Sequence, residues 1–166
     1  MVRRTQPTDV MELVLRHTYD APLARVYSAW IDPDQLKSWL RPTNEIEAVL
    51  AEVDLRIGGV YRLGYQVPGV AGELVVAGTY QEIVPNKKLV FTWEWESHPN
   101  FQGEETLVTV EFDEVDGQTE VTLTHQRFPT EVMRADHEWG WTGATEQLVR
   151  HCRFVCRSIP DGQRPF

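Results

Sequence analysis

Apolar and polar residues alternate along much of the chain, a pattern typical of β-strands that bury one face. The alternation is clearest in residues 88–96, 106–115 and 118–126, where apolar side chains take every second position. Successive side chains of a strand point to opposite faces, so each of these segments predicts one covered face and one wet face. His125 lies on the covered side of the last segment, in line with Leu123.

The same pattern, bounded by turn residues, predicts seven strands, at residues 11–19, 45–54, 60–66, 73–84, 88–96, 106–115 and 118–126. The last six follow one another through short connections, and Asp116-Gly117 is a favoured pair for a two-residue hairpin. Connections this short join antiparallel neighbours, which indicates a meander.

Helical spacing replaces the alternation just after the first strand. Two start signals, Asp20-Ala21-Pro22 and Asp32-Pro33, each precede apolar residues that recur three or four positions apart. A capping carboxylate followed by proline favours a helix start, so two short helices are expected between residues 20 and 40.

A much longer helix is predicted at residues 128–156. Its inner stripe, at helical spacing, consists of Met133, His137, Gly140, Trp141, Ala144, Leu148, His151 and Val155. Because strands precede this helix, the stripe indicates that the helix lies across a sheet. Gly140 is expected to let the sheet or a ligand approach closely, whereas Gly143 lies toward a flank and has no evident role. Trp139 points to the outer side.

Charge and length narrow the possible partners and location. The 166-residue chain has 16 basic and 25 acidic residues, a net charge of −9, so nucleic acid is not an expected partner. No apolar run approaches the roughly 20 residues of a membrane span, and residues 1–10 lack the apolar core of a signal peptide. Cys152 and Cys156, four apart on one helix, have poor geometry for a disulfide. We therefore expect a cytoplasmic protein without membrane insertion.

Five segments of the chain carry a family resemblance: APLARVYSAWIDPDQLKSWL (21–40), VDLRIGGVYR (53–62), GTYQEIVPNKKLVFTWEW (78–95), VTVEF (108–112) and HEWGWTGATEQL (137–148). Together they resemble the homologues of the activator of the 90-kDa heat-shock-protein ATPase, a family within the START and birch-pollen-allergen-like superfamily. The resemblance runs over most of the chain.

The resemblance implies an α+β helix-grip fold, a curved antiparallel sheet of about seven strands wrapped around a long C-terminal helix. It implies one START-like domain over residues 1–166, with 1–10 as a flexible tail. Superfamily members of this shape bind lipids, hormones or polyketides between sheet and helix, and a minority catalyse cyclisation or hydrolysis there. The eukaryotic co-chaperone has an additional chaperone-binding domain, for which this chain has no room.

A cavity between sheet and helix is therefore predicted, lined by Tyr65, Tyr80, Trp93, Trp95, Phe112, His125, His137 and Trp141. His137 is the first candidate for orienting a ligand or acting as a general base. Glu82 shares a predicted face with Tyr80, and if that face is buried, Glu82 is a candidate acid with a raised pKa. His125 and His137 could approach each other, but their spacing in the sequence is not that of a usual metal site. No metal or other cofactor is therefore expected.

The leading hypothesis is a non-enzymatic binder of a small hydrophobic, lipid- or polyketide-like molecule. Two alternatives stay open: a cyclase- or hydrolase-like enzyme that uses His137 or Glu82, and a protein-interaction module related to chaperone activation. A homodimer contact at Trp139 is a further hypothesis, because this large apolar side chain has no evident partner on the outer side of the helix.

Overall fold

Strand pairing organises the molecule into one antiparallel sheet. The computed structural model describes the backbone of residues 11–157 and the side chains of residues 11–153, so the predicted tail at 1–10 lies outside the described residues. Within this range the strands are β1 (Glu12–Tyr19), β2 (Glu47–Val53), β3 (Val60–Gln66), β4 (Glu73–Val84), β5 (Lys88–Ser97), β6 (Thr106–Val115) and β7 (Gln118–Gln126). Their order in the sheet is β1-β7-β6-β5-β4-β3-β2, which confirms the predicted meander.

The hairpin between β6 and β7 forms where Asp116-Gly117 predicts it. Both residues have positive φ, 54° and 80°, as a type I′ turn requires. The turn places Val115 opposite Gln118, and the register then continues down both strands until Val108 faces His125. A short turn thus determines which β7 side chains reach the covered face.

Among the described residues, three helices accompany the sheet: α2 (Leu23–Ile31), α3 (Pro33–Trp39) and α4 (Glu131–Arg157). The side chain of Asp32 caps α3 by accepting a hydrogen bond from the Asp34 amide at 3.0 Å. Pro22 itself occupies the N-cap position of α2, so Asp20 does not cap that helix as predicted. The long helix begins three residues later than expected, because Thr130 Oγ1 accepts from the Met133 amide and acts as its cap.

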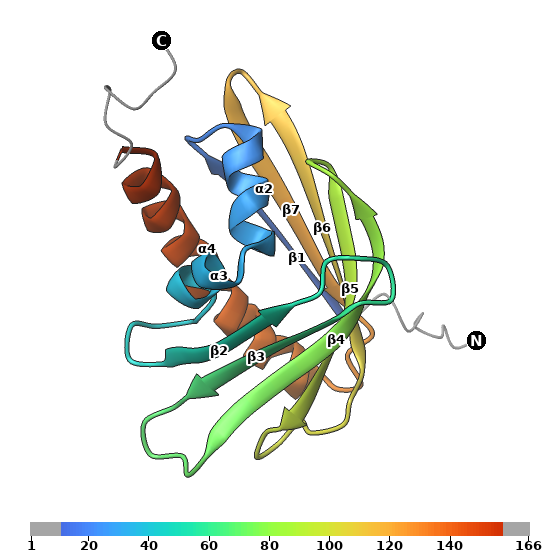
Figure 1. The fold of residues 1–166 in the computed structure, drawn as a ribbon. Coiled ribbons are helices and arrows are strands. Elements are labelled where there is room, and N and C mark those ends of the chain that lie inside the picture. The colour runs from blue at the N-terminus through green and yellow to red at the C-terminus, as the bar shows by residue number, and fades with distance from the viewer. Residues whose placement is uncertain (1–10, 158–166) are drawn as a thin grey trace, which may run out of the picture.

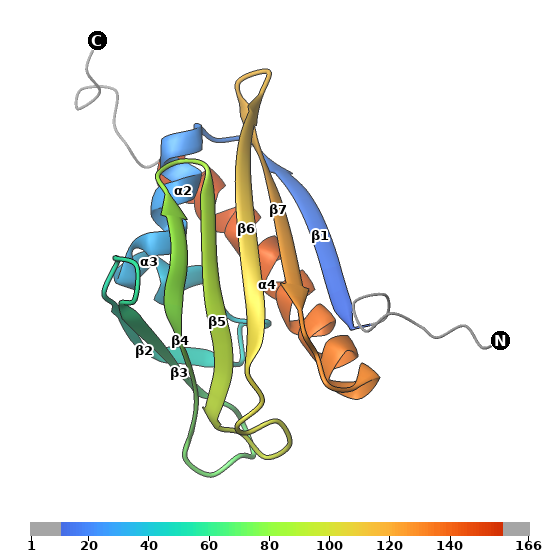
Figure 2. The same cartoon turned by 90° about the vertical axis from the view of Figure 1, so that its right-hand side faces the viewer.

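The sheet curves around α4, which crosses its concave face diagonally (Figures 1 and 2). The two short helices lie beside the upper part of α4, and α3 contacts both α4 and β2. This arrangement confirms the predicted helix-grip α+β fold. No helix within residues 11–157 has the length and apolar content needed to cross a bilayer.

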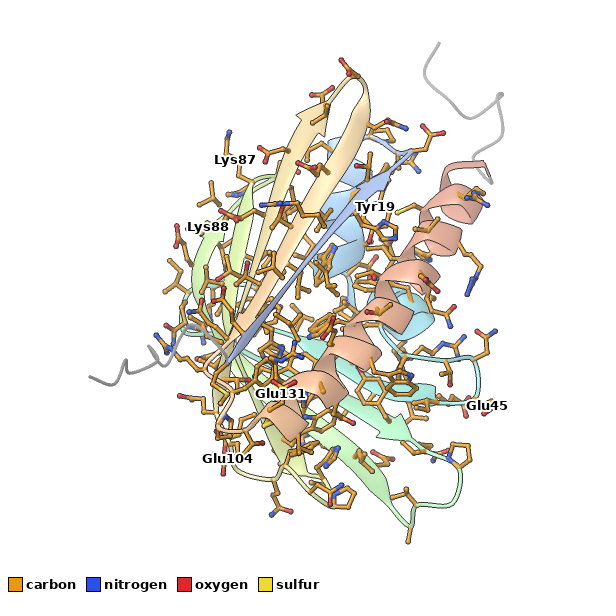
Figure 3. The ribbon with its side chains drawn as sticks, turned by 180° about the vertical axis from the view of Figure 1, so that it is seen from behind. Tyr19, Glu45, Lys87, Lys88, Glu104 and Glu131 are labelled. Carbon is orange, nitrogen blue, oxygen red and sulfur yellow. The ribbon has the colours of Figure 1, made fainter. Side chains whose placement is uncertain are left out.

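Packing on the inner side of α4 follows the predicted stripe with one change near its end. The buried side chains of this face are Met133, His137, Trp141, Ala144, Leu148 and Cys152. His151 turns away and its Nε2 lies 2.9 Å from Gln35 Oε1, a hydrogen-bonding contact with α3. The side chains of Val155 and Cys156 lie outside the described residues. Figure 3 shows the side opposite to that of Figure 1. In this view α4 lies nearest the reader, with side chains between it and the sheet.

Candidate functional site

A cavity of about 270 Å³ lies between α4 and the half of the sheet formed by β3, β4 and β5. The sheet contributes Tyr65, Leu74, Trp93 and Trp95, with Val67 and His98 from adjoining loops; α4 contributes Asp136, His137, Trp139, Gly140, Trp141 and Ala144; and the segment after α3 contributes Leu40, Arg41, Pro42 and Ile46. Most of these groups are apolar, and four of them are indoles.

Small residues on α4 keep this space empty. A Cβ atom added at Gly140 would meet no atom within 4 Å, so this position opens into unoccupied space. Ala144, one turn further along the same helix, also lines the cavity. Beside α2 the concave face is filled instead, because Trp30 packs edge-on against Trp39 and Phe112 and stacks on Trp141. The short helices therefore divide the concave face into a filled end and a hollow end.

His137 lies in the cavity wall with both ring nitrogens in contact with protein groups. Its Nδ1 is 2.9 Å from the Met133 carbonyl oxygen, and its Nε2 accepts the Trp95 indole hydrogen at 3.0 Å. A carbonyl can only accept, so Nδ1 carries the hydrogen and Nε2 is the acceptor. Burial lowers the pKa of His137 below 6.5, against an opposing effect of its bond to Met133. The imidazole is therefore neutral at pH 7.

His125 forms a second such arrangement behind the cavity wall. Its Nδ1 accepts the Trp141 indole hydrogen at 3.0 Å, and its Nε2 is 2.7 Å from Thr106 Oγ1. The Thr106 hydroxyl donates its own hydrogen to the Trp93 carbonyl, so it accepts from His125 Nε2–H. Full burial, with His137 nearby, lowers the pKa of His125 well below 6.5. Both histidines are thus neutral groups that hold tryptophans in place.

His98 is a cavity residue that the sequence analysis did not identify. Its Nδ1 accepts from the backbone amides of Asn100 and Phe101, at 3.0 and 3.2 Å. The hydrogen of the neutral ring must therefore be on Nε2. Burial lowers the pKa of His98 as well, with Asp136 opposing the shift. The ring lies 4.8 Å from the Trp95 ring, centroid to centroid, and extends the aromatic wall.

Two cavity-lining side chains have buried polar hydrogens that no described residue accepts. These are Arg41 Nε and Trp93 Nε1. Another guanidinium nitrogen of Arg41, Nη1, donates to the Ile46 carbonyl over a long 3.4 Å. An unmatched buried donor costs about 1–3 kcal/mol, so these two groups are a local cost to the fold.

Five of the eight side chains predicted to line a cavity do so: Tyr65, Trp93, Trp95, His137 and Trp141. Tyr80 lies instead in an aromatic cluster with Tyr61 and Phe91, and Phe112 lies under α2 against Tyr27. His125 lies behind the wall, where Trp141 and Thr106 contact its two ring nitrogens. Tyr80 and Phe112 were assigned to the cavity because they share the concave face, which the short helices in fact cover at that end.

Glu82 was a candidate acid only if its face of the strand were buried, and the structure places it on an exposed face. In β4, Tyr80 is opposite Phe91 while Glu82 is opposite Val90, so the strand contains one extra residue at Gln81. Such a β-bulge breaks the two-residue alternation and turns Glu82 to the other face. Glu82 is exposed there, and its carboxylate lies 3.4 Å from Lys88 Nζ.

Arg41, Trp139 and Gly143 also have places that the sequence pattern did not indicate. Trp139 was assigned to the outer side of α4, yet it lines the cavity while 58% exposed, so it lies at the mouth. A Cβ atom at Gly143 would overlap the carbonyl oxygen of Pro42, which shows that this glycine lets the segment after α3 approach α4. Arg41 and Pro42 directly follow the two short helices expected between residues 20 and 40, and both line the cavity.

Among the side chains that the structure describes, at residues 11–153, no three His, Cys, Asp or Glu groups are placed to hold a metal ion. The rings of His125 and His137 are 5.4 Å apart, but their nitrogens are already engaged with protein groups.

The architecture defines a helix-grip protein with an apolar cavity under its C-terminal helix. Comparison with known proteins gives the family: residues 20–153 match the activator of Hsp90 ATPase homolog 1-like proteins, and the chain belongs to that family. The resemblance found in the sequence is thereby confirmed.

Solved structures of low sequence identity share the fold. A protein from Chromobacterium violaceum is 22% identical, with a TM-score of 0.76 over 85% of this chain and 96% of that one. The AHSA1 protein from Silicibacter pomeroyi is 21% identical, with a TM-score of 0.75 over 87% of this chain and 99% of that one.

A curated relative is much longer. An uncharacterized protein of Schizosaccharomyces pombe is 27% identical over 113 residues, which are 68% of this chain and 29% of that protein. The chain therefore spans less than a third of the length of this relative.

Proposed function

We propose that this protein binds a small hydrophobic molecule in the cavity between the sheet and α4. The observation that carries the proposal is an apolar, aromatic-lined cavity whose histidines are already hydrogen-bonded to protein groups. Its volume of about 270 Å³ is close to the lower end of the usual range for ligand sites, roughly 300–1,000 Å³. The protein has thus formed the space in advance and needs no rearrangement to admit a compact ligand.

An acid–base enzyme is supported less well by the same geometry. A general base must present an unoccupied lone pair toward the substrate. In the cavity wall, the acceptor nitrogens of His137 and His98 both receive hydrogens from protein donors, and Glu82 lies outside. Asp136 lines the cavity, but its side chain is 49% exposed to solvent rather than enclosed with a bound molecule.

A protein-interaction module would favour a filled core and a continuous exposed apolar patch. The core here is hollow at one end, and the large exposed apolar side chains are distributed over several elements. Three of them lie close together in the sequence, Leu55 and Ile57 in the β2–β3 turn and Val60 at the start of β3. Nothing in the described part of the chain indicates which protein would bind to these exposed side chains.

The proposal is tested by filling the cavity from Gly140, where a larger side chain has room. Native protein is titrated with a neutral fluorescent probe, N-phenyl-1-naphthylamine, alongside Gly140→Leu. We expect saturable binding to the native protein and at least a tenfold weaker affinity in the variant, because the leucine occupies the probe's space. Thr142→Leu adds similar bulk to an exposed position of the same helix and serves as the control.

Equal binding by all three proteins would contradict the proposal, as would no binding to the native protein. If the native protein binds the probe and Gly140→Leu does not, native mass spectrometry of protein purified from its host, which detects a retained small molecule, would identify the ligand. The homodimer contact and the cytoplasmic location stay predictions.

A further inference from the structure

Several hydrogen-bond donors at the cavity have no acceptor among the described residues. Two of them, Arg41 Nε and Trp93 Nε1, are buried. His98 accepts two backbone amide hydrogens at Nδ1, so its own hydrogen is on Nε2. No described residue accepts that hydrogen either. The acceptor nitrogens of the wall are engaged already. A ligand that adds only donors would leave every one of these groups unmatched.

Arg41 is the most unusual of the three. The chain has 25 acidic residues against 16 basic ones, yet none of the carboxylates in residues 11–157 forms an ion pair with Arg41. Its side chain is half-buried, and the bond from Nη1 to the Ile46 carbonyl holds the guanidinium beside the cavity. Guanidinium groups favour carboxylates because the fork of N–H donors matches two oxygens.

One carboxylate lines the cavity, and it does not neutralise Arg41. Asp136 is half exposed to water and forms no ion pair with Arg41 among the described residues. A cation beside an otherwise apolar space needs a counter-charge that arrives with the ligand.

We propose that the ligand is a compact hydrophobic carboxylic acid whose carboxylate pairs with Arg41 and whose apolar part fills the aromatic cavity. This inference rests on the proposed function and adds the chemistry of the head group. The available volume, about that of nine water molecules, fits a medium-chain or aromatic acid and excludes a long two-chain lipid. Trp93 and His98 provide further donors beside the same space.

The test uses three probes with the same chain length and different heads: octanoate, 1-octanol and octylammonium. Binding to native protein is followed through the fluorescence of the tryptophans that line the cavity. We expect octanoate to bind at least tenfold more tightly than octylammonium, with octanol between them. Arg41→Met should weaken octanoate binding tenfold or more and change octanol binding less than threefold.

Two further variants separate the head-group contact from general effects. Arg150→Met removes the same charge from an exposed position of α4 and should leave all three affinities unchanged. Arg41→Lys retains a cation without the fork and should keep part of the preference for octanoate, which also shows that position 41 tolerates substitution. Circular dichroism of each variant verifies the fold.

Equal affinities for the three probes, or an Arg41→Met variant that behaves like Arg150→Met, would overturn the head-group inference and leave the hydrophobic cavity as a binding site. Failure of every probe to bind would overturn the proposed function itself, and the inference with it.

Discussion

Trp95 and Trp141 each donate an indole hydrogen to a histidine, and these two bonds determine how the cavity wall is held. Each histidine donates a hydrogen bond to an oxygen: His137 to the Met133 carbonyl and His125 to the Thr106 hydroxyl. Every polar atom in the two arrangements is matched, which allows four large polar side chains to be buried together. The histidines contribute to structure here rather than to proton transfer.

Acid should destabilise the protein through these histidines. The unfolded chain binds protons at histidine below about pH 6.5, whereas burial lowers the pKa of folded His125 and His137. The stabilising effect is therefore complete above pH 6.5 and is lost as the pH falls toward the folded pKa values. We expect the free energy of unfolding to fall by up to about 1.4 kcal/mol per pH unit for each histidine. Urea unfolding between pH 5 and 7.5 measures this slope.

His125→Gln serves as the comparison, because glutamine can also donate and accept. The variant should lose stability at pH 7.5, where packing is disturbed, and yet show a shallower decline on acidification than the native protein. A decline of the same slope in both proteins would show that His125 does not carry the effect.

The face to which a side chain points could be predicted where a regular strand or helix pattern alone decides it. His125 and His137 were assigned to the covered side correctly, because each belongs to a regular strand or helix stripe. Arg41 and His98 could not be found in this way, since both lie in irregular segments with no repeating pattern of side-chain direction. Their role depends on which atoms lie around them, and the sequence pattern does not report that.

At the scale of elements, the two glycines of α4 act in opposite ways. Gly140 faces empty space, whereas Gly143 lets the Pro42 carbonyl approach the helix. The sequence pattern placed them on different faces but left the role of Gly143 open, because the approaching segment comes from more than 100 positions earlier in the chain.

Alanine substitutions should separate these roles. Gly140→Ala is expected to stabilise the protein by about 1 kcal/mol through helix propensity, because the added methyl group meets no atom. Gly143→Ala is expected to destabilise it by about 1–3 kcal/mol, because the methyl group displaces the Pro42 carbonyl. Thermal unfolding of both variants measures the difference, and shifts of the same sign would contradict this account.

The β-bulge at Gln81 marks the limit of strand prediction. Turn residues that can be recognised in the sequence mark the ends of β3, β4 and β6, but nothing in the residues 80–82 signals an extra position in β4. A one-residue change of register turns every following side chain to the other face. The face of Glu82 could not be decided from the sequence for this reason.

For the molecule as a whole, the exposed side chain of Trp139 is relevant to whether two copies of the protein form a dimer. This side chain is 58% exposed and lies at the mouth of the cavity. If the protein is a dimer through this surface, Trp139→Ala should reduce its mass in analytical ultracentrifugation to that of the monomer. Val132→Ala, at a 71% exposed position of the same helix, is the control. A dimer that persists in Trp139→Ala would exclude this contact as the interface.

The general architecture was accessible from the sequence because seven alternating segments and one long stripe leave few ways to bury their apolar faces. The division of the concave face into a filled and a hollow end was not accessible. It depends on where α2 and α3 settle, and that position is determined by contacts such as Trp30 with Phe112 that join distant parts of the chain.

The segment between α3 and β2 supplies one whole wall of the cavity and is seated on α4 by only a few contacts. Pro42 rests on Gly143, and the Asn44 side chain accepts a hydrogen bond from Gln147 at 3.0 Å. Ile46, at the far end of the segment, packs against the buried core, whereas Arg41 and Pro42 line the cavity. The strand pairs of β2 begin at Glu47, so they do not depend on residues 41 and 42. Substitutions at these two positions therefore change the surface that a ligand meets and leave the strand pairing of the sheet in place.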